Sequence, residues 1–357
     1  MEKNNINISI SINDSKMSNQ KKKLLGISFV RACSSLGIVV FHYFSHSRGK
    51  FKLLYGTANS SWGFMFATTF FCISGTVLYY NYAKIQSLKK FYYKRWKSIF
   101  PAYYICFIFF FLNTAFEKKK LFYKAHWTKL FLTLFGLDGY LSYRINTYHI
   151  VGEWFLGVII IIYALYPLLI YILDINIFII YLILLFCYFL MYKTSIFIIE
   201  RDRNLITCIF SFYFGIISIK FKKIFLKNKI FLVFSLFLFI LLYTIKININ
   251  AFIIIFQLQG FSLYIIFFQF GEYIMSKGNA TIFQEISKIS FSIYLIQHRI
   301  IFDVLGLKNP IQWYSHIILL GITILLILIC SKIHFMVVDS VIKSDLFKKI
   351  DAFFLLN

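Results

Sequence analysis

Long runs of mostly apolar residues alternate with short polar and basic segments along almost the whole chain. A helix of roughly 20 apolar residues crosses the hydrocarbon core of a bilayer, where every backbone polar group must find its partner within the protein. The pattern therefore predicts an all-α integral membrane protein with about ten transmembrane helices in one bundle. Their expected bounds are 24–43, 62–82, 98–115, 150–172, 175–192, 205–219, 229–247, 250–274, 286–305 and 312–336.

The spacing of these runs indicates one domain, because no Gly/Ser/Pro-rich linker and no internal repeat separates them. We expect a membrane domain over residues 21–340. Residues 1–20 are polar and lack the apolar core of a secretory signal peptide, so they are predicted to form a disordered cytoplasmic tail. Residues 341–357 are expected to form a second, short cytoplasmic tail.

Composition and charge agree with this assignment. Of the 357 residues, 60% are hydrophobic, which is typical of membrane proteins. The net charge of +24 comes from residues between the apolar runs, so no nucleic-acid partner is expected. Lys and Arg are more frequent in segments that are cytoplasmic if the N-terminus lies inside, which predicts both termini on that side. Abundant Ile, Lys, Asn and Phe with little Pro indicate an AT-rich bacterial genome and hence a bacterial inner membrane.

Two ionisable residues interrupt the first apolar run. Arg31 and His42 are eleven positions apart, so they share one helix face, about 16 Å apart along the axis. Ionisable groups inside a membrane are costly and usually face the bundle interior or a water-filled cavity, where they mark a site. Alternatively, His42 is an interfacial residue and the Arg31 side chain extends to the inner surface.

A basic segment, KKFYYKRWKSIFPAYY, precedes the third run. It places Lys94, Arg95 and Lys97 at the expected cytoplasmic interface, before Pro101, which suits the first turn of a helix. We therefore expect the third helix to begin near Pro101. The positive-inside rule explains most of this patch. Its charge would also attract a phosphorylated cytosolic ligand.

Two further segments carry polar residues at expected membrane depth. In YHIVGEWFLG, His149 and Glu153 have i, i+4 spacing, so on one helix face the carboxylate would orient the imidazole. An interfacial glutamate in contact with water is the alternative. In ISFSIYLIQHRII, Gln297, His298 and Arg299 point in three directions around a helix, so at least one faces the protein interior.

Motifs of other chemistries are missing from the sequence. His42 and His46 have i, i+4 spacing, but no third ligand is near in sequence and the HExxH glutamate is absent, so no metal site is predicted. The six cysteines show no paired CxxC spacing, which argues against disulfides or a thiolate site. Without a GxSxG elbow, a P-loop or GxGxxG, hydrolase and nucleotide-fold functions have no support.

In order and spacing, these features resemble the acyltransferase-3 family, multispanning enzymes that O-acylate bacterial surface polysaccharides and related glycans. The resemblance covers residues 26–300. The chain departs from the family pattern at Ser98, where the second arginine of RxxR would stand, and at Tyr148, where a tryptophan would stand. The matching segments are the Arg31 and His42 pair, FFCISG with Ser74, RWKSIFP with Arg95 and Pro101, YHIVGE with Glu153, and ISFSIYLIQH with His298.

The resemblance implies a membrane O-acetyltransferase, one of the acyltransferases that transfer groups other than amino-acyl groups. Its donor would be acetyl-CoA or another acyl-CoA, bound as a substrate, and no permanently bound cofactor is expected. The acceptor would be a hydroxyl of a surface polysaccharide or a lipid-linked glycan. The implied roles are catalysis for His42, Glu153 and Arg31, donor binding for Arg95, Lys94 and Lys97, and acceptor binding for His149, His298 and Ser74.

A transporter or flippase of a lipid-linked glycan is the main alternative, because it too would need basic inner residues and polar groups at depth. Secondary transporters, however, tend to carry inverted repeats and helices broken by Gly or Pro. Here no repeat is visible, and Pro167 is the only proline well inside an expected span. A glycan polymerase would need large external loops, and only residues 116–149 offer one.

Overall fold

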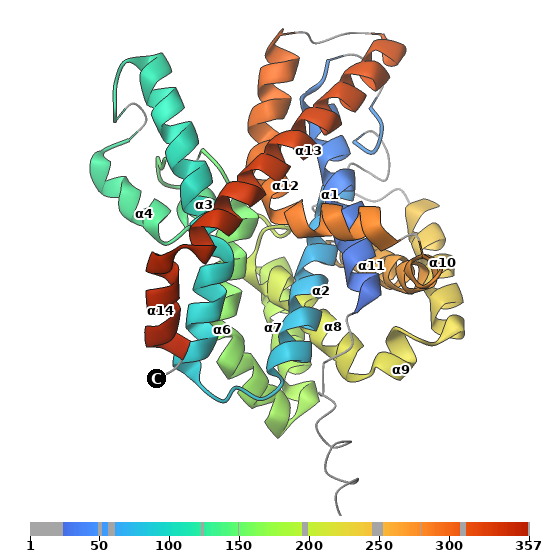
Figure 1. Cartoon of the computed structure of the whole chain (residues 1–357). Helices are drawn as coiled ribbons and strands as arrows, with labels where there is room; N and C mark the ends of the chain where they lie inside the picture. The colour runs from blue at the N-terminus through green and yellow to red at the C-terminus, as the bar shows by residue number, and fades with distance from the viewer. Residues whose placement is uncertain are drawn as a thin grey trace, which may run out of the picture.

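The computed structural model describes residues 24–48, 52–55, 61–122, 125–148, 150–194, 199–244, 253–278, 280–307 and 312–355. All regular structure within these ranges is helical (Figure 1). The tail expected at residues 1–20 lies outside them. The helices are α1 (Leu25–His46), α2 (Trp62–Tyr82), α3 (Leu88–Lys118), α4 (Leu130–Leu134), α5 (Asp138–Leu141), α6 (Trp154–Ile175), α7 (Ile177–Lys193), α8 (Leu205–Lys220), α9 (Lys222–Phe225), α10 (Lys229–Thr244), α11 (Ile253–Ser276), α12 (Ala280–Leu307), α13 (Trp313–Lys343) and α14 (Asp345–Leu355), with a 3-10 turn at Trp127–Lys129.

Seven of these helices, α1, α2, α3, α6, α11, α12 and α13, are long and apolar enough to cross a membrane. Each of the ten predicted apolar runs contains a helix, but α7, α8 and α10 have only 16 or 17 residues, fewer than the roughly 20 of a full span. The chain is thus an all-helical, multi-pass membrane protein. The number of ten spans and the cytoplasmic location of both termini stay predictions.

The closest helix pair is α2 with α8, and two glycines make it possible. A Cβ added at Gly75 would lie 1.9 Å from the carbonyl oxygen of Phe212, and one at Gly215 would lie 2.1 Å from that of Cys72. Between them, Thr76 Oγ1 donates a hydrogen bond to the Gly215 carbonyl at 2.9 Å. Small residues allow helices in a membrane to pack backbone to backbone. The glycine of FFCISG is therefore a packing residue.

The third helix begins much earlier than expected. Ser87 caps α3 by accepting a hydrogen bond from the N–H of Lys90 at 3.3 Å. Phe91, which is buried, stacks on Tyr166 of α6 with ring centroids 5.4 Å apart, so this first turn is anchored in the core. Pro101 lies inside the helix, and the expectation that it starts the helix is wrong. The basic segment therefore forms the first turns of α3.

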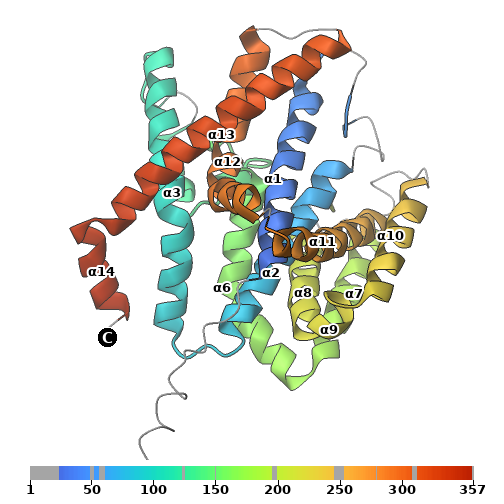
Figure 2. The same ribbon diagram turned by 45° about the vertical axis from the view of Figure 1, so that its right-hand side comes forward.

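The last two helices cross back over the bundle. In both views α13 runs obliquely past α12 and α3, and α14 lies beside the first turns of α3 (Figures 1 and 2). Residues 345–355, within the segment expected to be a short tail, are thus a docked helix.

Five clusters of buried apolar residues form the core of the described part of the chain, and three of them are large. The largest joins α2, α3, α6, α7 and α8. A second joins α1, α2 and α11, and a third joins α1, α12 and α13. Because α1 packs against α2, α11 and α12, the first apolar run lies in the middle of the bundle (Figure 2). Arg31 and His42 of α1 therefore lie among other helices, whereas His46 at the end of α1 is exposed.

Candidate functional site

A cavity of about 890 Å³ lies among α1, α2, α3, α6 and α12. Besides Phe41, α1 contributes Arg31, Ser35, Ile38, His42 and His46 to the lining, and these five follow one another at spacings of three or four residues. Such spacings place side chains on one face of a helix. Arg31 and His42 therefore share a face, as expected, and that face borders the cavity.

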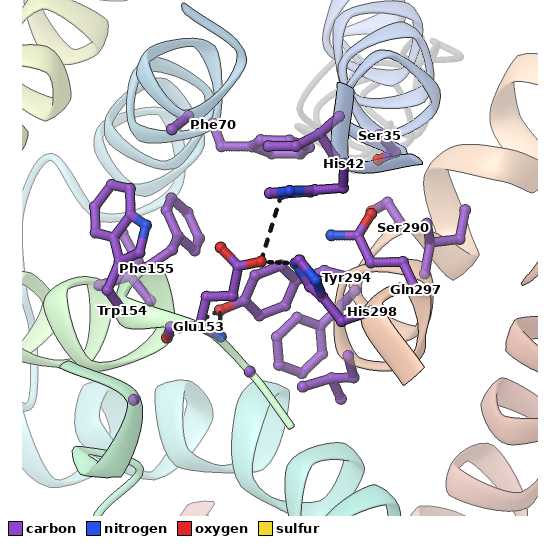
Figure 3. A pocket seen from close by; sticks show the side chains of 18 of the residues that line it. Ser35, His42, Phe70, Glu153, Trp154, Phe155, Ser290, Tyr294, Gln297 and His298 are labelled. Carbon is purple, nitrogen blue, oxygen red and sulfur yellow. Dashed lines mark hydrogen bonds and ion pairs between the residues drawn. The ribbon is translucent and has the colours of Figure 1, made fainter. Parts of the chain in front are cut away.

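The centre of the site is a carboxylate between two imidazoles. Nε2 of His42 lies 3.4 Å from Oε1 of Glu153, and Nε2 of His298 contacts the same oxygen (Figure 3). The two imidazole centroids are 4.2 Å apart. The three side chains are only 14%, 22% and 23% exposed, so water screens their interaction weakly. A carboxylate so placed fixes the tautomer of an imidazole and stabilises its protonated form.

Tyr294 fixes the backbone of Glu153. Its hydroxyl accepts hydrogen bonds from the N–H groups of Glu153 at 2.6 Å and Leu156 at 3.1 Å, and it lies 3.2 Å from the Glu153 carbonyl oxygen, to which it donates. Both N–H groups belong to the start of α6, where the first N–H groups of a helix lack i−4 carbonyl partners, and that of Leu156 also lies 3.1 Å from the Glu153 carbonyl oxygen. Tyr294 stands one turn before His298 on α12. One helix thus positions both the carboxylate and one of its imidazoles.

The chain that leads into Glu153 is not helical. Val151 and Gly152 form a bend, and Gly152 has a φ of 69°, a left-handed conformation that favours glycine. The expectation that His149 and Glu153 share a helix face is therefore wrong, and His149 itself lies outside the described residues. The segment also passes very close to α5, because a Cβ added at Gly139 would lie 2.8 Å from the Glu153 carbonyl oxygen.

A buried aspartate holds the segment that Glu153 follows. Asp138 is 1% exposed, and its Oδ1 accepts a hydrogen bond from the Tyr103 hydroxyl at 3.0 Å. Its backbone carbonyl accepts another from Thr147 Oγ1 at 3.1 Å. Sequence reasoning did not single out Asp138 or Tyr294. For Tyr294, the available signal was its i, i+4 spacing to His298 within ISFSIYLIQH.

Gln297 faces the same cavity. The side chain is fully buried, and neither its nitrogen nor its oxygen has a hydrogen-bond partner among the described residues. Figure 3 shows its carboxamide pointing into the space beside His42. An unpaired amide inside a protein is costly. The group is therefore available to a molecule that enters the cavity.

Arg31 lines the cavity farther along α1, and no ion pair joins its guanidinium to a carboxylate in the described part of the chain. Ser74 of α2 and Ser98 of α3 also line this cavity. A cation in such surroundings favours an anionic or strongly polar ligand. Ser98, which replaces an arginine of the family pattern, leaves that wall with one positive charge fewer.

The three predicted donor-binding residues lie in different surroundings. Arg95 stands over the rings of Tyr82 and Tyr163 at 5.2 and 5.8 Å, and Tyr163 lines the cavity. Lys94 is exposed. Lys97 forms an ion pair with Asp351 of α14 at 2.6 Å. Arg95 is thus in contact with a residue that lines the cavity.

The cavity rim near the start of α8 carries opposite charges. Asp202 and Arg203 both line it, and Arg203 Nε lies 3.8 Å from Asp202 Oδ2. Burial raises the pKa of the Asp202 carboxyl above its usual value, although Arg203 opposes this. Burial therefore disfavours the charged form of Asp202, and the neighbouring guanidinium of Arg203 favours it.

A third imidazole approaches the pair at the centre. Ring nitrogens of His42, His46 and His298 all lie within 4.8 Å of one another. The sequence places no third candidate ligand near His42 and His46, whereas in the structure His298 of α12 lies beside them.

Comparison with known proteins gives one match. A family model described as an acyltransferase domain matches residues 24–333. No curated protein and no solved structure matches the chain. Every residue that lines the cavity falls within the matched range.

Proposed function

Because the chain belongs to the acyltransferase-3 family and is therefore a membrane acyltransferase, we propose that it moves an acetyl group from cytosolic acetyl-CoA to a hydroxyl of a cell-surface glycan. The observation that carries this proposal is the contact of Glu153 with both His42 and His298 at the wall of the cavity that Arg31 also lines. We place the protein in a bacterial inner membrane, with the donor arriving from the cytosol.

The lining of the cavity supports a donor and an acceptor of this kind. Coenzyme A carries several phosphate charges, which Arg95 and Lys94 would hold at the start of α3, while Arg31 would lie along the path of the acyl arm. Trp154 and Phe155 lie beside Glu153 (Figure 3). Mostly apolar walls with a few convergent polar groups are typical of small-molecule sites.

His42 would act as the general base. With its Nε2–H directed at Glu153, the other ring nitrogen takes the proton of the acceptor hydroxyl. The hydroxyl oxygen forms a bond to the thioester carbonyl carbon, the carbon–sulfur bond then breaks, and the imidazolium returns its proton to the departing thiolate. Base catalysis by a positioned histidine contributes roughly 100- to 10,000-fold, so alignment of thioester and hydroxyl must supply much of the remaining acceleration.

Gln297 and His298 would support this step. The amide of Gln297 would donate a hydrogen bond to the oxygen that becomes negative when the hydroxyl attacks. His298 would hold the Glu153 carboxylate in place against His42. Of the residues expected to bind the acceptor, Ser74 keeps that proposed role as a cavity-lining hydroxyl.

The test uses membranes that contain equal amounts of wild type, His42→Ala, Glu153→Gln or His126→Ala. His126 is exposed and does not line the cavity, so it controls for the loss of a histidine. Each membrane receives acetyl-CoA labelled in the acetyl group and an extract of surface glycans. We expect label in the glycan with wild type and His126→Ala, and a loss of at least 100-fold with the other two variants. Equal transfer by His42→Ala would refute its proposed role.

A further inference from the structure

The cluster at the cavity contains the ligands of a transition-metal site. His42 and His46 lie one turn apart on α1, and His298 faces them from α12, with ring nitrogens within 4.8 Å of one another. Oε1 of Glu153 contacts both His42 and His298, so a carboxylate oxygen lies beside the three imidazoles. Three histidines and one carboxylate are a set of donors that tetrahedral Zn²⁺ accepts.

The geometry requires only small movements to bind the ion. Zinc–nitrogen bonds of 2.0–2.1 Å in a tetrahedron place neighbouring nitrogens about 3.4 Å apart, which rotation of the exposed His46 ring can approach. The centroids of the His46 and His298 rings are 6.1 Å apart, and those of His42 and His298 are 4.2 Å apart. His46 also lines the cavity, so an ion can reach the cluster from there.

We propose that His42, His46 and His298, with Glu153, form a reversible binding site for Zn²⁺, and that the bound ion blocks acyl transfer. Imidazole ligands favour zinc, whereas Mg²⁺ and Ca²⁺ prefer oxygen ligands. The site is therefore selective for zinc over these two more abundant ions.

The blocking effect follows from the chemistry of His42 and rests on its proposed function as the base. Coordination fixes the imidazole of His42 on the ion, and the Glu153 carboxylate then binds the ion instead of orienting the ring. An imidazole bound in this way cannot turn its free nitrogen to the acceptor hydroxyl. Binding of the ion does not itself depend on the protein being an acyltransferase, so the two can be tested separately.

The binding test uses the purified full-length chain in detergent after treatment with EDTA. Zn²⁺ is titrated by calorimetry into wild type, His46→Ala and His126→Ala, and Co²⁺ is added separately to record its visible absorption. Removal of a residue that only supports a metal ligand costs roughly 10- to 100-fold in metal affinity, so loss of a ligand should cost at least as much. We expect this loss in His46→Ala alone, together with loss of the absorption of tetrahedral Co²⁺. Equal Zn²⁺ affinity in the three proteins would refute the proposed site. Competition by Mg²⁺ at the same concentration as Zn²⁺ would also refute it.

The functional test measures acetyl transfer as the Zn²⁺ concentration rises. The rate of each protein in EDTA is its own reference, so the comparison does not depend on the three proteins being equally active. Zn²⁺ should inhibit wild type and His126→Ala, while His46→Ala should need at least ten times more for half inhibition. Wild type that is inactive in EDTA and restored by Zn²⁺ would overturn the blocking effect. If none of the three proteins transfers acetyl, the proposed function fails, but the binding titration still shows whether the Zn²⁺ site exists.

Discussion

Nζ of Lys97 lies 2.6 Å from Oδ2 of Asp351, and this ion pair ties α14 to the first turns of α3. The Tyr93 hydroxyl donates a second hydrogen bond to Asp351 at 2.7 Å, and the Tyr93 ring stacks on Phe354 with centroids 4.6 Å apart. The C-terminal helix thus covers part of the basic segment that we propose to meet the phosphates of the donor (Figure 2).

We expect Asp351→Asn to lower the KM for acetyl-CoA by up to about fivefold without changing kcat, because Lys97 becomes available to the donor. An ion pair near the surface is worth about 0.2–1 kcal/mol, which limits the effect. Asp345→Asn is the matched control, because Asp345 pairs with Lys348 within α14. Initial rates against acetyl-CoA concentration give both constants. A higher KM in Asp351→Asn would instead mean that the docking of α14 onto α3 promotes binding of the donor.

The same ion pair predicts how stability depends on pH. Hydrogen bonds from Lys97 and Tyr93 hold the pKa of Asp351 below its usual value of 3.8. A lowered pKa stabilises the folded protein above the usual value, and this contribution is lost as the pH falls through the lowered pKa. The difference in Tm between wild type and Asp351→Asn should therefore be constant from about pH 8 to about pH 5 and shrink below 3.8. A difference that grows in acid would contradict the assignment.

The helices could be predicted because length and apolarity determine them. The start of α3 could not, because the basic residues that follow Ser87 do not belong to an apolar run, although a serine cap and the buried Phe91 make them helical. Pro101 gave the wrong signal because a proline is also tolerated inside a membrane helix.

We expect Tyr294→Phe to lower kcat at least tenfold while the KM for the donor stays the same. The variant loses the hydroxyl that receives the N–H groups of Glu153 and Leu156, so the carboxylate is held less firmly against His42. Loss of the hydrogen bond from the Glu153 N–H should also cost about 0.5–1.5 kcal/mol of stability, whereas the Leu156 N–H keeps its bond to the Glu153 carbonyl oxygen. Tyr273→Phe is the control, since Tyr273 is exposed and its side chain contacts Lys277 rather than the site. Unchanged kcat in Tyr294→Phe would mean that catalysis does not depend on the hydrogen bonds between Tyr294 and the Glu153 backbone.

Gln297→Leu should lower kcat by roughly 100- to 1,000-fold, the usual effect of removing one donor to a developing oxyanion. Gln259 provides a close control, because it is equally buried, its amide also has no hydrogen-bond partner among the described residues, and it does not line the cavity. Gln259→Leu should therefore leave kcat unchanged. Single-turnover rates measure the effect. Similar losses in the two variants would indicate a packing defect.

Gly75→Ala should lower the Tm strongly in detergent. Its Cβ would meet the backbone carbonyl of Phe212, which cannot rotate away as a side chain can, so the cost should reach or exceed the about 1–3 kcal/mol typical of overpacking. At Gly321 of α13 a Cβ would meet nothing within 4 Å, so Gly321→Ala should keep or slightly raise the Tm. Equal Tm values would exclude close α2 and α8 packing.

The site was predictable only in part. Helical spacing placed Arg31 and His42 on one face, and the structure has both at the cavity. Spacing also suggested His149 as the partner of Glu153, but the left-handed turn at Gly152 breaks the helix before Glu153. The imidazoles that contact Glu153 come from α1 and α12, and pairing between distant segments cannot be read from local periodicity.

The separation of these segments has a consequence for biosynthesis. Chains are made from the N-terminus, so α1 with His42 enters the membrane long before α12 with His298 leaves the ribosome. Until then, Glu153 has only one of its two imidazoles, and Tyr294 is not present to fix its backbone. A nascent or prematurely terminated chain therefore lacks the complete cluster of His42, Glu153 and His298.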